Sequence, residues 1–131
     1  MRTFRETLVV HALSPAARTD GTANGTGIDR SPGNRYGSVV FAITTGVLTD
    51  GIHTFKIQDA DADTGYADAA AGDVDGTASV TAITNDNVAF SFAYKGSKRW
   101  VRLVCTTSGA TTGGILGAVA VLGNPHVYPT Q

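Results

Sequence analysis

The sequence predicts an all-β protein, built as a β-sandwich or a barrel. Short runs of residues alternate between apolar and small or polar side chains, and turn signals separate them at about the 8–12-residue spacing typical of such folds. No segment keeps the 3.6-residue period of an amphipathic helix. Sixteen glycines among 131 residues also disfavour helices, because glycine is costly inside a helix and common in turns. A chain of this length forms about one domain.

The two ends of the chain are expected to be extended. Residues 1–36 are predicted to form an arm or long loop with one short strand at Leu8–Val10. Small and polar residues dominate the rest of this stretch, and they bury too little apolar surface to offset the entropy of ordering. Residues 37–131 are expected to form the core and to end in a short extended tail, since proline biases the residue before it away from helix.

Two pairs of strands are predicted in the core. Residues 38–45 and 52–58 alternate on either side of an Asp-Gly turn, which predicts a β-hairpin or neighbouring strands. The first of them is apolar or small on both faces, which is typical of a strand inside a sandwich or under a neighbouring subunit. Residues 88–94 and 100–106 show the clearest hairpin pattern, with a turn at Lys95–Lys98.

The last predicted strand covers residues 115–122. It follows a Thr- and Gly-rich turn over residues 106–114. Gly117 lies inside this strand, and a glycine at such a position indicates close approach of another backbone.

The segment between the two strand pairs, residues 59–87, is acidic and contains no Lys or Arg. Asp59, Asp61 and Asp63 alternate at its start, and carboxylates on one loop can converge on Ca²⁺. The pattern differs from an EF-hand, because the glycine comes one place late, Ala70 replaces the final Glu and no amphipathic helix flanks the loop. These three aspartates are therefore a weak calcium candidate, and a solvated acidic loop is the favoured interpretation.

Composition and motifs exclude several classes of function. Ten Lys and Arg balance eleven Asp and Glu, whereas a nucleic-acid-binding protein needs a basic excess. No apolar run is long enough to span a bilayer or to form a signal peptide. The single Cys105 is expected to be a small buried residue, and the three histidines are expected at strand edges or in loops. No catalytic residues, resident metal or cofactor are predicted, and an enzyme is disfavoured.

A basic cluster surrounds the turn near residue 97. It contains Lys95, Lys98, Arg99 and Arg102. These side chains are expected to be solvated or to pair with an acidic surface, either the acidic segment of the same chain or that of a neighbour.

Three segments resemble a pattern found in small virion proteins of tailed bacteriophages. They are Gly46–Asp61, Tyr94–Arg102 and the glycine-rich stretch from Gly113 to Pro125. The resemblance covers about residues 38–127. These residues look like the proteins encoded with the major capsid protein in phage head modules, which are often capsid cement or decoration proteins with β-sandwich or jelly-roll cores. The resemblance thus implies a jelly-roll-like sandwich with no catalytic residues.

The implied function is structural. The chain would be made in the host cytoplasm, bind the exterior of the capsid and stabilise contacts between major capsid subunits, as a homotrimer or homodimer and without nucleic-acid or membrane partners. A head–tail connector or tail component is the alternative, and a carbohydrate- or Ca²⁺-binding sandwich is the alternative of another class. The candidate contact residues are the basic side chains Arg2, Arg5, Arg18, Arg30, Arg35, Lys95, Lys98, Arg99 and Arg102.

Overall fold

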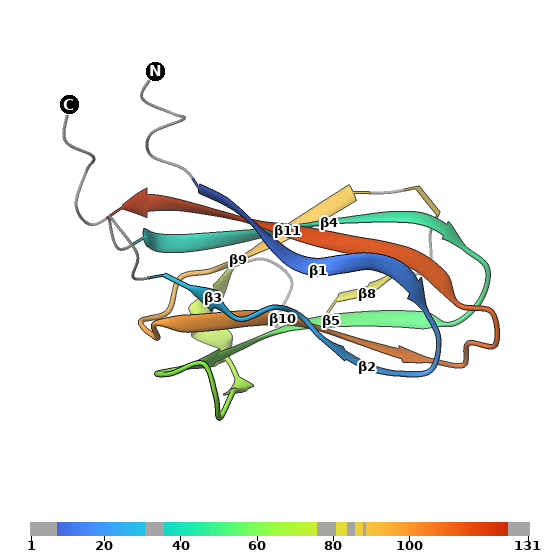
Figure 1. Cartoon of the computed structure of the whole chain (residues 1–131), viewed down its shortest axis with the longest axis horizontal. Coiled ribbons are helices and arrows are strands. Elements are labelled where there is room, and N and C mark those ends of the chain that lie inside the picture. Colours follow the sequence, from blue (N-terminus) through green and yellow to red (C-terminus); the bar gives the residue numbers. More distant parts are fainter. Residues whose placement is uncertain (1–7, 31–35, 76–80, 84–85, 88, 126–131) are drawn as a thin grey trace, which may run out of the picture.

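The computed structural model describes residues 8–30, 36–75, 81–83, 86–87 and 89–125. Its strands form two antiparallel sheets packed face to face (Figure 1), which confirms the predicted all-β sandwich. The first sheet has the order β1-β11-β4-β9-β7. Its strands are β1 (Leu8–Arg18), β11 (Gly114–Pro125), β4 (Tyr36–Leu48), β9 (Ala89–Tyr94) and β7 (Val74–Asp75). The second sheet has the order β2-β10-β5-β6, with β3 beside β10 and β8 beside β5. Its strands are β2 (Gly21–Asn24), β10 (Trp100–Ser108), β5 (Ile52–Ala60), β6 (Ala67–Asp68), β3 (Ile28–Asp29) and β8 (Thr81–Ile83).

The strand order is that of a jelly roll. Strands from the first half of the chain pair with strands from the second half, β1 with β11, β2 with β10 and β4 with β9. Two further pairs, β11 with β4 and β10 with β5, connect these strands within each sheet. This is the arrangement of a long folded hairpin that is rolled into two layers.

The core lies between the inner faces of the two sheets. On β4 every second residue is buried, so Val39, Phe41 and Ile43 point inward. On β5 the alternation buries Phe55 and Ile57 from the opposite side. Alternating burial of this kind is what a strand shows when one face covers a core and the other does not.

Neither predicted hairpin forms, although their strands do. β4 and β5 belong to different sheets, and so do β9 and β10. Period-two alternation shows that one face of a strand is buried but does not identify its partner, so a short connection can equally cross from one sheet to the other. At the β4–β5 connection the Asp50 carboxylate accepts backbone N–H groups from Thr111 to Gly113, at 2.6–3.4 Å.

The predicted irregular arm over residues 1–36 is wrong for the part that the structure describes. Residues 8–29 supply β1, β2 and β3, and β1 and β2 lie at the edges of the two sheets. Edge strands tolerate polar residues and proline, which explains why Pro15 fits within β1, at an irregularity in its register. A Cβ at Gly117 would lie 2.8 Å from the Cα of Pro15, so the predicted close backbone approach is confirmed.

The acidic segment and the C-terminus are only partly described. β6, β7, β8 and a 3₁₀ turn at Ala71–Asp73 occupy the acidic segment. β11 continues to Pro125, three residues beyond the predicted strand end at residue 122. The rest of the predicted tail, residues 126–131, lies outside the described residues.

Candidate functional site: a neutral sheet face and a charged end

The outward side of β1, β11, β4 and β9 is an uncharged surface, which we call the neutral face. Arg18, at the end of β1, is the only Lys, Arg, Asp or Glu in these four strands. The outward residues include Val9, Val40 and Val119, which are 62%, 37% and 41% exposed. Neighbouring apolar residues of this exposure mark interaction surfaces more often than isolated ones do.

Cross-strand register arranges the neutral face in rows. One row runs Val9, Val121, Val40 and Ala93, and its three β-branched valines form what we call the ridge. The next row runs His11, Val119, Ala42 and Ser91. His11, at the β1 edge, is the only ionisable side chain in these two rows, and its Nε2 lies 3.0 Å from the Ser14 Oγ.

A shallow hollow lies beside the ridge. It has a volume of about 410 Å³ and is lined by outward residues of β4, β9 and β11 and by Ile43, which points inward. The lining residues are Ala42, Ile43, Thr44, Ala89, Ser91 and Val119. The neutral face therefore has a row of larger, branched side chains and a depression next to each other.

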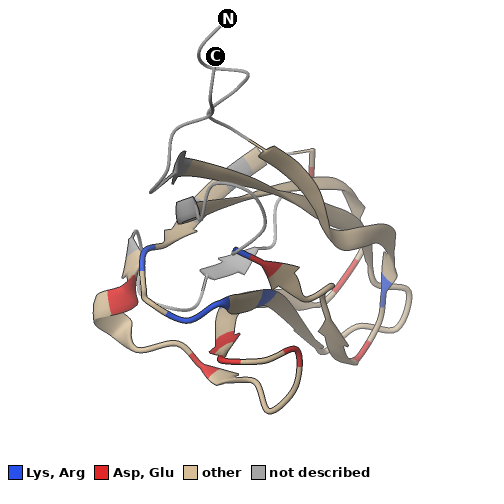
Figure 2. Cartoon of the chain, turned by 60° about the vertical axis from the view of Figure 1, so that its left-hand side comes forward, with Lys and Arg blue, Asp and Glu red and all other residues tan. Residues whose placement is uncertain are grey.

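The opposite, outward side of the second sheet is polar and charged. Arg102 Nε and Nη2 donate to the Gln58 Oε1 at 2.9 and 2.7 Å, and Gln58 Nε2 donates to Asp68 at 3.0 Å. Lys56 Nζ lies 3.0 Å from the same Asp68 carboxylate. In Figure 2 the charged segments gather on this sheet and on its loops, while the first sheet is almost entirely uncharged.

Arg30 organises the charged end of the sandwich, where β3, the start of β10 and the end of β5 meet. Its side chain is 7% exposed, and its Nη1 donates to the carbonyl oxygens of Gly96 and Lys98 at 2.8 and 2.6 Å. Its guanidinium lies 5.0 Å from the centroid of the Tyr94 ring. Burial lowers the pKa of Arg30, partly opposed by Tyr94 and Asp59. Arg30 is thus a structural anchor of the loop between β9 and β10.

Tyr94 connects this loop to β5. Its hydroxyl donates to Asp59 Oδ2 at 2.8 Å and accepts the Lys98 backbone N–H at 3.1 Å. Burial is the main reason that the pKa of Tyr94 lies well above its usual value, and Asp59 adds to it. The phenol therefore stays protonated and acts as a buried bridge.

The structure brings the predicted basic cluster together but pairs it within the chain. Arg99 makes two hydrogen bonds to Asp29, at 2.9 and 2.8 Å, and Lys98 Nζ lies 3.2 Å from Asp61. Arg102 lies over the Tyr66 ring at 4.4 Å, in addition to its bonds to Gln58. Exposed pairs of this kind hold loops in place but contribute little stability.

The three aspartates of the calcium candidate point to separate partners. Asp59 is buried against Tyr94, Asp61 pairs with Lys98, and Asp63 accepts the Tyr66 hydroxyl at 2.6 Å. Within the described residues, no three His, Cys, Asp or Glu side chains are gathered as metal ligands would be. The loop geometry is therefore explained by internal hydrogen bonds.

The remaining candidate contact residues are scattered. Arg2, Arg5 and Arg35 lie outside the described residues. Arg18 donates to the Ser14 carbonyl at the end of β1. Lys95 is exposed on the β9–β10 loop, where its backbone N–H donates to the Asp73 carbonyl at 2.8 Å.

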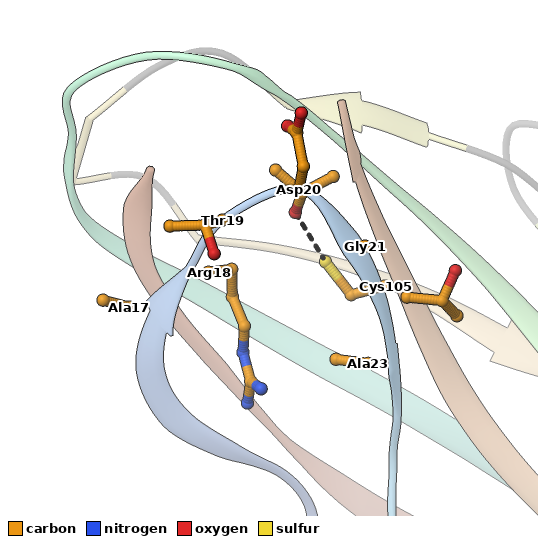
Figure 3. Close-up of a pocket in the computed structure, with 9 residues that line it drawn as sticks. Ala17, Arg18, Thr19, Asp20, Gly21, Ala23 and Cys105 are labelled. Carbon is orange, nitrogen blue, oxygen red and sulfur yellow. Dashed lines mark hydrogen bonds between the residues drawn. The ribbon is translucent and has the colours of Figure 1, made fainter. Parts of the chain in front are cut away.

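A small pocket lies beneath the β1–β2 connection (Figure 3). It has a volume of about 190 Å³, and Arg18, Cys105 and Thr107 are among its lining residues. Cys105 is 1% exposed, as predicted, and burial raises the pKa of its thiol. Its Sγ lies 3.9 Å from the Thr107 Oγ1. A buried thiol of raised pKa is a poor nucleophile.

His53 differs from its prediction, because it is fully buried rather than at a strand edge or in a loop. It lies on the inward side of β5, and its Nδ1 lies 2.8 Å from the Thr107 Oγ1. Its Nε2 is buried without a hydrogen-bond partner. Burial lowers the pKa of His53, and the backbone and then the carboxylate charge of Asp50 partly oppose this.

Sequence reasoning concentrated on charged residues and missed the neutral face as a site. The sequence signal for this face was the absence of charged residues over 36–48 and 114–125, together with the apolar pattern on both faces of 38–45.

No protein-family model matches the chain, and neither the curated proteins nor the solved structures give a match. No helix in the described part of the chain is long and apolar enough to cross a membrane.

Proposed function

We propose that this chain is a non-enzymatic structural protein of a bacteriophage virion. It binds the capsid exterior and stabilises contacts between major capsid subunits. The observation that carries the proposal is the neutral face, an outward sheet surface with exposed valines whose central strands β4 and β11 contain no Lys, Arg, Asp or Glu. The resemblance of residues 38–127 to phage head-module proteins supplies the biological setting.

The neutral face has the composition of a protein interface. The centres of interfaces are depleted in charged residues, because each buried charge must be desolvated. The second sheet has the ordinary solvent-facing pattern, with Lys56, Asp68 and Arg102 joined through Gln58. One molecule therefore carries one surface suited to water and one suited to a protein partner.

The charged end supports a structural role. Arg30 and Tyr94 are used in buried contacts that fix the β9–β10 loop, and Lys98 and Arg99 pair with aspartates of the same chain. These groups hold the shape of the sandwich. Copies that contact both the shell and each other would then bind tightly although each contact is modest, because one contact raises the effective concentration for the next.

The test is binding of the purified chain to expanded shells of its phage. We expect stoichiometric addition, measured by co-sedimentation, and a higher shell disruption temperature, measured by calorimetry. A chain that leaves both the pellet composition and the disruption temperature unchanged would contradict the proposal.

Copy number separates this function from a connector or tail role. A cement protein is present in hundreds of copies per particle, whereas a connector forms a single ring. Quantitative mass spectrometry of purified particles gives this number directly. A count matching one ring would replace the cement assignment with a connector.

A further inference from the structure

The neutral face has a shape that can complement itself. Its ridge of Val9, Val121 and Val40 lies one row from the hollow lined by Ala42, Thr44 and Ser91. A two-fold axis through the middle of the face would set the ridge of one copy over the hollow of the other, and the reverse. In such an isologous interface the same contact occurs twice, so both hollows are filled.

Charge also favours a second copy of this chain as the occupant. Apart from Arg18 at the end of β1, the strands of the neutral face contain no Lys, Arg, Asp or Glu, so pairing two copies through the middle of the face leaves no such charge to be desolvated or left unpaired. Pairing it with the second sheet would instead bury Lys56, Asp68 or Arg102. The matched surface that the molecule itself offers is therefore the same face of another copy.

The area fits a reversible dimer. Strands about 4.8 Å apart and rising about 3.3 Å per residue give the face about 19 Å by 23 Å, or about 900 Å² for two copies. This lies below the area of about 1,000 Å² expected of a stable specific interface and in the range of weak or transient contacts. We expect a dimer in exchange with monomer in solution, made firmer wherever a shell holds two copies next to each other.

We propose that two copies of the chain pair through their neutral faces about a two-fold axis near Val119 and Ala42. This rests on the proposed function for its setting and names the partner of that same surface. The pairing uses the neutral face between the two copies, so the second sheet and the charged end of each copy are the surfaces that remain for the shell. It predicts that the unit added to a shell is a dimer.

The experiment measures mass in solution and uses charge at the centre of the face. Sedimentation of the wild type from about 10 µM to 1 mM should show a species of twice the 13.5 kDa chain mass. Val119→Lys and Val119→Glu should each weaken pairing at least about 100-fold, because two like charges meet near the axis. Mixing the two variants in equal amounts should restore the dimer.

The matched control is Thr106→Lys, an exposed outward position on β10 in the second sheet, which should dimerise as the wild type does. Circular dichroism melting of all variants checks that each is folded, and Ser91→Arg in the hollow repeats the test if a residue 119 variant is not. A wild type that stays monomeric at 1 mM, a trimer, or a dimer unaffected by these charges would overturn the pairing. If the chain is a monomer that still binds shells, the pairing is wrong and the proposed function stands. If it is a dimer that does not bind shells, the proposed function is wrong and the pairing stands.

Discussion

The two sheets of this sandwich have similar inner faces and opposite outer faces. Phe41 on β4 and Phe55 on β5 are both fully buried, so each sheet contributes to the same core. Outward, the first sheet presents valine, alanine, threonine and serine, whereas the second presents Lys56, Gln58 and Arg102. Folding accounts for the inner faces, but it does not require one outer face to lack charge. The difference therefore points to a partner for the first sheet.

The largest expected effect tests whether the inner faces are equivalent. Phe41→Ala and Phe55→Ala should each lower the free energy of unfolding by about 3–5 kcal/mol, since each removes a large buried ring and leaves a cavity. Urea denaturation measures both. If only one of the two substitutions lowered the free energy of unfolding, the two sheets would not contribute equally to one core.

The next effect concerns the charged end. Arg30→Ala should cost about 2–4 kcal/mol, because it removes a buried guanidinium and leaves the part-buried carbonyl oxygens of Gly96 and Lys98 without this donor. Arg99→Ala is the matched control, because Arg99 pairs with Asp29 at the surface, and we expect no measurable loss from it. Equal losses in the two variants would show that the buried anchor and the exposed pair contribute alike.

A smaller effect depends on pH and on the inner face of the second sheet. Burial lowers the pKa of His53 below the ordinary value of about 6.5 for histidine, so the unfolded chain binds a proton more readily than the folded one. Stability from the neutral imidazole is therefore fully present above pH 6.5 and decreases as the pH falls through the unfolded and then the folded pKa. His53→Gln should reduce this dependence in urea titrations between pH 7.5 and 5. An unchanged pH profile in the variant would assign the effect to other groups.

The smallest effect is expected on the outward side of the second sheet. Lys56→Ala removes an exposed pair with Asp68 and should change the free energy of unfolding by no more than about 0.5 kcal/mol. It should also leave the sedimentation mass unchanged. A change in mass would place the association surface on the second sheet rather than on the neutral face.

Local sequence patterns predicted where most strands lie, but they did not predict which strands pair with each other. The alternation over 38–45 and 52–58 located β4 and β5 correctly, but the pairing was wrong because the Asp50–Gly51 connection crosses between sheets. The Gly51 φ of +91° suits a tight turn of either kind. Strand choice depends on contacts far apart in the sequence, which alternation does not encode.

The edge strands show a second limit of sequence reasoning. β1 contains Pro15 and exposed residues, so its composition resembled a loop, yet it pairs with β11 along most of its length. An edge strand needs only one row of backbone partners and tolerates polar side chains. The charged residues were easier to find than to interpret, because Lys98 and Arg99 proved to have partners within the chain.

The most direct test of the neutral face as an interface is cysteine labelling in assembled particles. Ser91→Cys places a thiol on the neutral face and Thr106→Cys places one on the second sheet, both at exposed positions. The wild type is the blank, since Cys105 is buried. In dilute isolated protein both new thiols should react with a maleimide at similar rates. In particles we expect Ser91→Cys to be protected and Thr106→Cys to remain the more reactive of the two, whereas full reactivity of Ser91→Cys in the particle would contradict the central claim.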